Sequence, residues 1–327
     1  MTDPAPPTAR RPVPNRGAGQ PGGVRQPGGA GQSGGTAQPG GAEVGRGHGR
    51  GAALRAFAGH RLGLLGLAVI AALAAFCFLG PLLYHTDQVH ANIQLTNLPP
   101  GRGRPLGTDA NGYDILGRLM VGGQATLEIC FAVAALATAF GVFWGAVSGY
   151  AGGLADSIMM RVVDIALAIP AIFVLIYLAS VFRPTVALLI VVLSALSWLG
   201  PARLVRGEVL SLRTREFIQA VTIMGGRRLR VVARHLVPNA AGTIVVNSTF
   251  QVADAIILLA TLSFLGFGLP PPAATWGGML SQGTTYLLDG YWWEVYPAGF
   301  AIVLTVVAVN LVGEAVAGAL DARLRPG

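Results

Sequence analysis

Long apolar segments separated by short polar ones dominate the chain from Leu62 onward. Six of them approach the roughly 20 residues that the hydrocarbon core of a bilayer requires. Each is expected to be a helix, because a backbone in lipid must satisfy its own hydrogen bonds. The predicted spans are residues 62–84, 125–147, 162–182, 185–202, 240–264 and 297–320.

Small residues recur inside two of these segments, as GLLGLAVIAALAAF in the first and GVFWGAVSG in the second. Small side chains let helix backbones approach each other closely in lipid. The composition agrees, since 53% of the residues are hydrophobic and only 12% are charged. A soluble domain carries about 25% charged residues. The pattern therefore predicts an all-α, polytopic membrane protein with closely packed helices.

The residues before the first segment have a different composition. Residues 1–53 are rich in Gly, Pro and Gln, and the sequence QPGG occurs three times among them. Such a segment buries too little apolar area to offset its chain entropy. We expect a disordered cytoplasmic tail over 1–53 and a transmembrane domain over 54–327.

The charge pattern predicts the orientation in the membrane. All 23 basic residues are arginine, and the net charge is +8. A P-loop nucleotide site needs lysine, so this chain does not carry one. Nucleic-acid binding is disfavoured, because the arginines lie between apolar segments rather than on a soluble domain. With the N-terminus inside, fifteen arginines near the spans face the cytoplasm and four face outward. The positive-inside rule then places both termini in the cytoplasm.

The longest cytoplasmic loop in this topology, residues 203–239, holds eight of the arginines and is named the basic segment here. Within it, apolar residues recur at helical spacing and predict a short helix with one apolar stripe. The stripe consists of Phe217, Ile218, Val221 and Met224. Gly225 is expected to end this helix, and a second short helix should run on until Pro238. Two short helices joined at a glycine form an exposed elbow.

Three interpretations fit an amphipathic helix in such a loop. It could lie on lipid headgroups, or it could insert its apolar stripe into a groove on a cytoplasmic partner. A DNA-binding helix-turn-helix is disfavoured, because a loop tethered between two spans could scarcely reach a groove of DNA.

Polar residues inside the predicted spans are candidate functional residues, because a carboxylate near the bilayer centre normally faces a cavity or a protein interior. Asn247, Gln251 and Asp254 are spaced i, i+4 and i+7 on one face of the fifth span. One hypothesis is that this face lines a substrate path. The alternative is a structural hydrogen-bond cluster. Glu128, Asp164, Asn310 and Glu314 favour structural roles.

Metal and thiol chemistry find little support in the sequence. His85, Asp87 and His90 are too loosely spaced for a convergent metal site. Cys77 and Cys130 lie in apolar segments, where a free thiol behaves as a small hydrophobic group. No metal site and no cofactor on this chain are expected.

The basic segment resembles the EAA loop of ABC importer permeases. Here the motif reads Gln219-Ala220-Val221, then Gly225, His235, Val237 and Pro238, with the glycine and proline at the expected spacing. Three further stretches resemble the permeases of dipeptide, oligopeptide and nickel importers, in particular the second permease of each pair. They are LGTDANGYDILGRL (106–119), LSFLGFGLPPPAATWGGML (262–280) and YPAGFAIVLTVVAVNLVGEAVAGALDARLR (296–325). The sequence departs from the family at Tyr113, where arginine is usual, and at Leu259, where many relatives have glutamate.

The resemblance implies a type I ABC importer permease fold of six helices in the bacterial plasma membrane. It also implies a homologous permease partner, two cytoplasmic ATPases that carry ATP and Mg, and an external binding protein. The chain itself would not be an enzyme. In the family the EAA loop docks into an ATPase. That role would fall on Glu216, Phe217, Ile218, Gln219, Ala220, Val221, Met224, Gly225 and Pro238.

The expected function is ATP-driven import of di- or oligopeptides, with nickel or another small solute as the alternative substrate. An ion-driven secondary carrier is a second alternative, which Asp254 supports slightly. A membrane enzyme is disfavoured, since neither H-E-x-x-H nor G-x-S-x-G is present.

Overall fold

The computed structural model describes residues 58–224 and 227–324. Within these ranges the regular elements are helices, accompanied by two isolated β-bridges. The helical fold class predicted from the apolar segments is therefore confirmed. The predicted tail, residues 1–53, and Gly225 lie outside the described residues.

Four helices are each long and apolar enough to cross a membrane. They are α2 (Arg61–Leu83), α3 (Ile115–Ala151), α11 (Ala241–Leu262) with its π-helical extension η3 (Ser263–Phe267), and α13 (Tyr296–Leu324). Two bent pairs follow α3 in the chain, and each pair meets the same criteria as one broken span. They are α4 (Gly153–Ala168) with α5 (Ala171–Val181), bent by 77°, and α6 (Val186–Ser197) with α7 (Leu199–Arg213), bent by 41°.

Two predicted spans differ from the structure for physical reasons. The second, predicted to begin at residue 125, belongs to a helix that begins at Ile115. Its first turns contain Arg118 and Gln124, which lowered their apparent hydrophobicity. The third, predicted as one helix over 162–182, is broken before Pro170. Proline has no amide hydrogen and disfavours a helical conformation in the preceding residue.

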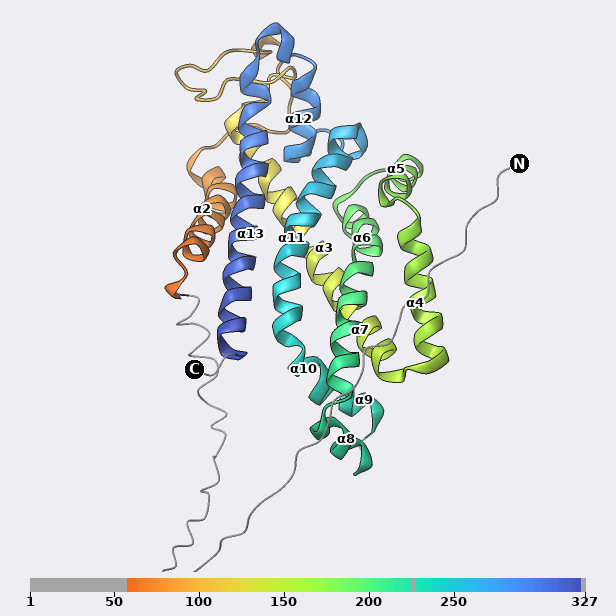
Figure 1. Ribbon diagram of the computed structural model, residues 1–327. Coiled ribbons are helices and arrows are strands. Elements are labelled where there is room, and N and C mark those ends of the chain that lie inside the picture. Colours follow the sequence, from red (N-terminus) through yellow and green to blue (C-terminus); the bar gives the residue numbers. More distant parts are fainter. Residues whose placement is uncertain (1–57, 225–226, 325–327) are drawn as a thin grey trace, which may run out of the picture. The chain divides into compact units, whose positions relative to one another are not determined.

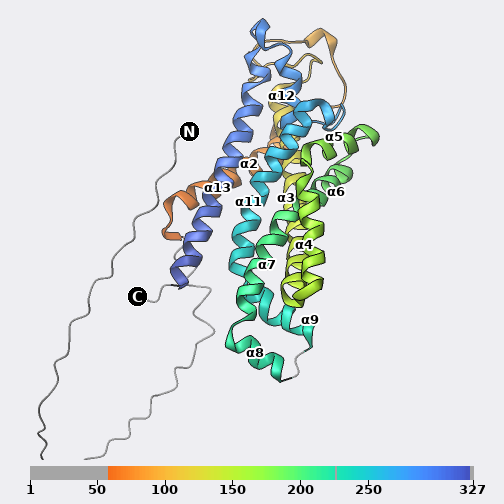
Figure 2. The same ribbon diagram turned by 45° about the vertical axis from the view of Figure 1, so that its right-hand side comes forward.

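Helix α3 lies at the centre of the bundle and packs against α2, α6, α7 and α11, while α13 packs against α2 and α11 (Figures 1 and 2). The largest apolar core lies between α3, α5, α6, α11 and α13. At one end of the bundle lie the short helices α8 (Glu216–Ile223), α9 (Arg228–Val231) and α10 (Val237–Asn239). The opposite end carries the cap, which we define as residues 84–114 and 268–295. Its helices are η1 (Ile93–Leu95), α12 (Trp276–Thr284), η4 (Leu287–Asp289) and η5 (Trp292–Glu294).

Glycines allow the close helix contacts that the small-residue segments predicted. A Cβ atom added at Gly66 of α2 would lie 2.6 Å from the carbonyl oxygen of Ala308 on α13. One added at Gly145 of α3 would lie 2.3 Å from the carbonyl oxygen of Ala202 on α7. Both distances are far inside van der Waals contact, so these helix pairs approach through backbone surfaces that only glycine permits.

Candidate functional site

The basic segment folds into the end of α7, then α8, α9, the π-helix η2 (Val232–Leu236) and α10. A first short helix after Arg215 and a second helical stretch beyond residue 227 agree with the prediction. Pro238 does not end the second stretch, because it lies in the first turn of α10. A missing amide hydrogen leaves no hydrogen bond unmade at that position.

The apolar residues of α8 do not form the single stripe that the sequence predicted. Ile218 is buried in a core with α3, α7 and η2, and Val221 packs against the same core. Phe217 and Met224 are exposed. The prediction was wrong because one side of this short helix is used to attach it to the bundle. Only the remaining apolar residues are left on the other side.

The exposed side of α8 is nevertheless strongly apolar. Phe217 is 45% exposed, Ile223 86% and Met224 78%. Phe217, Ala220 and Met224 are spaced i, i+3 and i+7, so they lie along one face of the helix. Glu216 and Gln219 are exposed beside them, and the Gln219 amide donates a 3.3 Å hydrogen bond to the Thr214 carbonyl oxygen. Large apolar side chains exposed together at a polar end of a protein mark an interaction surface.

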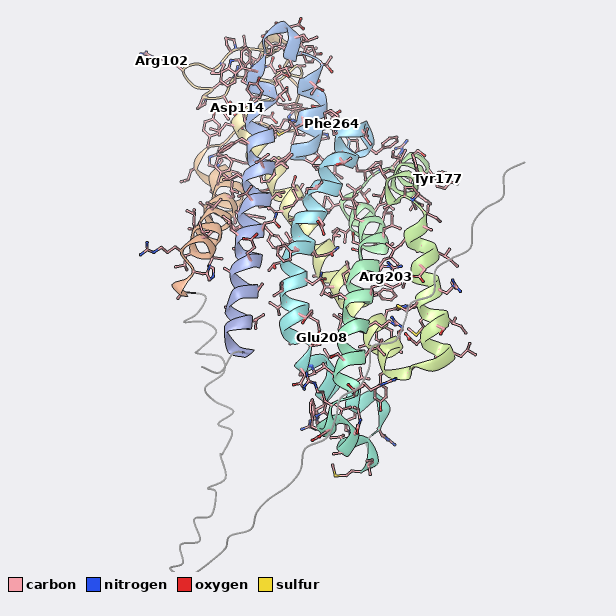
Figure 3. The ribbon with its side chains drawn as sticks, viewed as in Figure 1. Arg102, Asp114, Tyr177, Arg203, Glu208 and Phe264 are labelled. Carbon is pink, nitrogen blue, oxygen red and sulfur yellow. The ribbon has the colours of Figure 1, made fainter. Side chains whose placement is uncertain are left out.

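Charged side chains bind α7, the helix that leads into α8, to its neighbours α3 and α4. Asp156 of α4 accepts two hydrogen bonds from the Arg206 guanidinium of α7, both 2.6 Å long, and a further one from Ser148 of α3. A second pair, Arg203 with Asp164, joins the same two helices nearer the cap and is about half exposed. Figure 3 shows Arg203 and Glu208 along α7.

The end of α3 is also held by this helix. The Arg213 guanidinium donates to the carbonyl oxygens of Gly149 and Tyr150, each at 3.3 Å. A cation there complements the negative end of the α3 dipole. Sequence reasoning missed these partners, because acid and base are about fifty positions apart in the chain. It considered only the local pair of Asp156 with Arg161, whereas the partner of Asp156 is Arg206.

The three polar residues predicted on one face of the fifth span have different surroundings. Gln251 is buried, and its amide donates a 3.1 Å hydrogen bond to the Ser197 carbonyl oxygen at the end of α6. Asn247 is half-buried. Asp254 is exposed beside the exposed side chains of Ile257 and Phe264. Gln251 thus holds two helices of this chain together, while Asp254 points away from the chain.

The histidines of the cap do not converge on a metal site. His90 contacts Asp87 at 2.9 Å in an exposed pair. Hydrogen bonds from the amides of Val89 and His90 lower the pKa of Asp87 to about 2. Throughout residues 58–224 and 227–324, no three His, Cys, Asp or Glu side chains are grouped to hold a metal ion. Both cysteines are free and buried.

Comparison with known proteins places this architecture in a family. Residues 141–326 match the family described as the binding-protein-dependent transport system inner membrane component. Residues 51–100 match the N-terminal transmembrane domain of oligopeptide transport permease C. Since the first match covers more than half of the chain, the protein belongs to the family of binding-protein-dependent transport system inner membrane components.

Individual relatives agree with this assignment. The oligopeptide transport system permease protein OppC of Bacillus subtilis is 37% identical over 273 residues, which cover 84% of this chain and 89% of the relative. The dipeptide transport system permease protein DppC of the same organism is 35% identical, covering 81% and 83%. OppC of Haemophilus influenzae is 36% identical, covering 67% and 70%. The resemblance inferred from the sequence motifs is thereby confirmed.

Proposed function

We propose that this chain is one of two homologous permease subunits of an ATP-driven ABC importer for di- or oligopeptides. Its similarity to permeases named for oligopeptide and dipeptide transport supports the substrate class. The observation that carries the proposal is the two-sided helix α8, which is anchored by Ile218 and exposes Phe217 and Met224.

In this proposal the exposed face of α8 fills a groove on a cytoplasmic ATPase. Phe217, Ala220 and Met224 supply the apolar contact, and Glu216 and Gln219 lie at its polar rim. Ile218 and Val221 connect the docked helix to α3 and α7, so closure of the ATPases displaces the bundle. Gly225 would set the turn after α8, and Pro238 the entry into the following span.

The remaining partners follow from the two ends of the bundle. The arginine distribution supports an orientation in which the basic segment and both termini are cytoplasmic. The cap then faces outward, where an external binding protein delivers the substrate. ATP and Mg are held by the ATPase subunits. The residues assigned as the permease domain are 54–327, preceded by the glycine-rich tail, 1–53.

Asp254 is our candidate for the translocation path. An exposed carboxylate among apolar side chains is costly against lipid, so it should face the second permease or the cavity between the two subunits. Asn247 would border the same path from the preceding turns of α11. Gln251 would position α11 through its bond to α6.

Crosslinking in native membranes tests the docking helix directly. The full-length chain carrying Met224→Cys is labelled with a photoactivatable thiol reagent, and the captured proteins are assayed for ATP hydrolysis. Both native cysteines are buried, so the background labelling should be low. Leu288→Cys is the matched control, because Leu288 is 99% exposed but lies in the cap.

We expect Met224→Cys to capture an ATP-hydrolysing protein and Leu288→Cys not to do so. Capture of lipid alone would favour an interfacial helix and contradict the proposal. Uptake of a labelled dipeptide by membrane vesicles should be blocked by vanadate. Block by an ionophore instead would indicate an ion-driven carrier, and uptake of nickel but not peptide would indicate the alternative substrate.

A further inference from the structure

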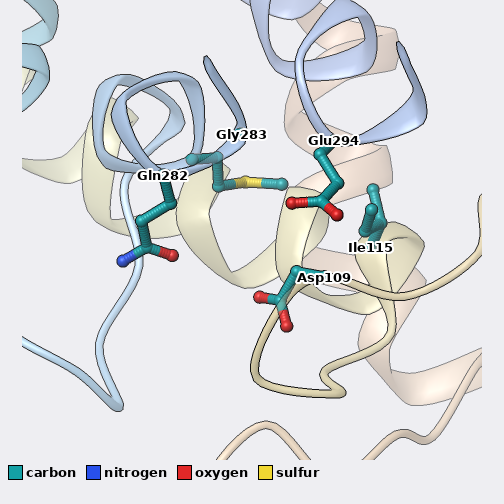
Figure 4. Close-up of a pocket in the computed structure, with 6 residues that line it drawn as sticks. Asp109, Ile115, Gln282, Gly283 and Glu294 are labelled. Atoms are coloured by element: carbon teal, nitrogen blue, oxygen red, sulfur yellow. The ribbon is translucent and has the colours of Figure 1, made fainter. Parts of the chain in front are cut away.

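Two acidic side chains meet in a buried pocket where the cap joins the bundle (Figure 4). Asp109 is 7% exposed and Glu294 is 3% exposed. The pocket is small, and the rest of its lining is Ile115, Met279, Gln282 and Gly283. The two acids come from segments far apart in sequence, one on each side of the cap.

Asp109 is well supplied with hydrogen-bond donors. One of its carboxylate oxygens accepts from the amides of Asn111 and Tyr113, each at 2.9 Å. The other oxygen lies 3.4 Å from Nε of Arg118, which is almost fully buried. Burial raises the pKa of Asp109, while the Tyr113 amide and Arg118 act in the opposite direction. These donors favour the charged form of Asp109 over that of a carboxyl group without them.

Glu294 has far fewer partners. The backbone amide of Ala110 is its hydrogen-bond donor. Its Oε1 atom is buried and makes no hydrogen bond to any residue that the structure describes. An ionised carboxylate left in this state costs several kcal/mol, so a buried carboxyl group of this kind normally takes up a proton.

Arg118 does not balance both acids. Its guanidinium is engaged by Asp109, donates to the Pro272 carbonyl oxygen at 3.2 Å, and stacks on the Tyr113 ring at 4.2 Å. With both carboxyl groups ionised, the cluster would carry one uncompensated negative charge. The size of the pocket and the nearby arginine disfavour a divalent metal ion, and a single proton supplies the charge that is lacking.

We propose that Asp109 and Glu294 form a proton-binding site that fastens the cap. The proton resides on Glu294, whose neutral carboxyl group can share it with the carboxylate of Asp109. The site joins the turn at 109–113 to η5, next to the 3.3 Å hydrogen bond from the Trp293 indole to the Thr108 carbonyl oxygen. When the proton leaves, two carboxylates repel each other in the pocket, and this junction of the cap is weakened.

The expected pH dependence follows from proton counting. The folded chain keeps a proton that the unfolded chain releases near the ordinary carboxyl pKa of about 4. Between that pH and the titration of the folded site, the folded state therefore binds more protons than the unfolded state. Stability is then highest at low pH and falls as pH rises through this window.

Thermal unfolding of the full-length chain in lipid nanodiscs measures this linkage. Between about pH 5 and pH 8 we expect Tm of the Glu294→Gln variant to fall less than that of the wild type. At the upper end of this range the variant should unfold about 3 °C or more above the wild type. The matched control is Asp289→Asn, since Asp289 is an exposed acid of the same cap. It should leave the wild-type pH profile unchanged.

A spectroscopic measurement distinguishes a bound proton from a purely structural effect of the glutamine. The infrared C=O stretch of a neutral carboxylic acid should appear in the wild-type minus Glu294→Gln difference spectrum at pH 6 and disappear as pH rises. Equal pH profiles for wild type and variant, or no such band, would overturn the proposal. A wild-type Tm at pH 8 that rises with sodium but not with choline would identify a metal cation instead, and would also overturn it.

Discussion

Two polar side chains three positions apart on α11 show how strongly burial separates roles that spacing cannot. Gln251 is buried and bonded to the Ser197 carbonyl oxygen. Asp254 is exposed next to apolar neighbours. Both lie on the predicted polar face, but they sit at its opposite edges, one inside the chain and one outside. Substitutions at the two sites should therefore have opposite effects on stability and transport.

We expect Asp254→Asn to reduce peptide uptake at least about tenfold, the effect of losing roughly 1.4 kcal/mol of interaction with the substrate path. The Tm of the isolated chain should stay the same or rise, because an exposed charge among apolar side chains is removed. Gln251→Leu should instead lower the free energy of unfolding by about 1–3 kcal/mol, since it leaves the Ser197 carbonyl unpaired.

Uptake into vesicles at matched protein abundance and Tm of the purified chain measure both effects. Full uptake by Asp254→Asn would remove Asp254 from the translocation path. A loss of Tm in that variant would indicate that the carboxylate has a structural role instead.

At the scale of elements, the contact between α3 and α7 depends on a line of glycines. Gly141, Gly145 and Gly149 are four residues apart, and a Cβ atom on any of them would lie 3.0 Å or less from an atom of α7. For Gly145 the nearest atoms belong to the backbone of Ala202 and Arg206. Backbone cannot rotate away as a side chain can, so a methyl group there must push the helices apart.

Gly145→Ala should therefore lower the free energy of unfolding by about 1–3 kcal/mol, the usual cost of overpacking. Gly207→Ala is the matched control on the facing helix, because a Cβ atom at Gly207 would meet nothing within 4 Å. That variant should be neutral or more stable by up to about 1 kcal/mol, since alanine favours helix. Equal Tm values for the two variants in detergent would contradict this account of the interface.

The sequence predicted those elements that depend on local composition and missed those that depend on distant partners. Apolar length indicated the helices, and small residues indicated their close packing. The early start of α3 was missed, because Arg118 is satisfied by cap residues and Gln124 by the Cys77 carbonyl of α2. The inward side of α8 was missed for the same reason. A helical pattern shows that Ile218 is apolar but not that α7 and η2 cover it.

At the scale of the whole molecule, motion of α8 must reach the bundle through the contacts that hold α7. Two Asp–Arg pairs join α7 to α4, and they differ in surroundings. Asp156 and Arg206 form a two-pronged, largely buried pair to which Ser148 of α3 also contributes. Asp164 and Arg203 form a pair that is about half exposed on each side. The buried pair links three helices at the level where the basic segment begins.

This difference predicts that the two pairs contribute unequally to transmission. Asp156→Asn removes the charge opposite Arg206, so α7 should move with less of its load transferred to α3 and α4. Peptide uptake should fall about tenfold or more, while Met224→Cys in the same chain still captures the ATPase. Asp164→Asn should have a much smaller effect, because an exposed pair is worth at most about 1 kcal/mol and Arg203 can extend its charge to a polar surface. Loss of capture together with uptake in Asp156→Asn would show that the pair shapes the docking surface rather than transmitting its motion.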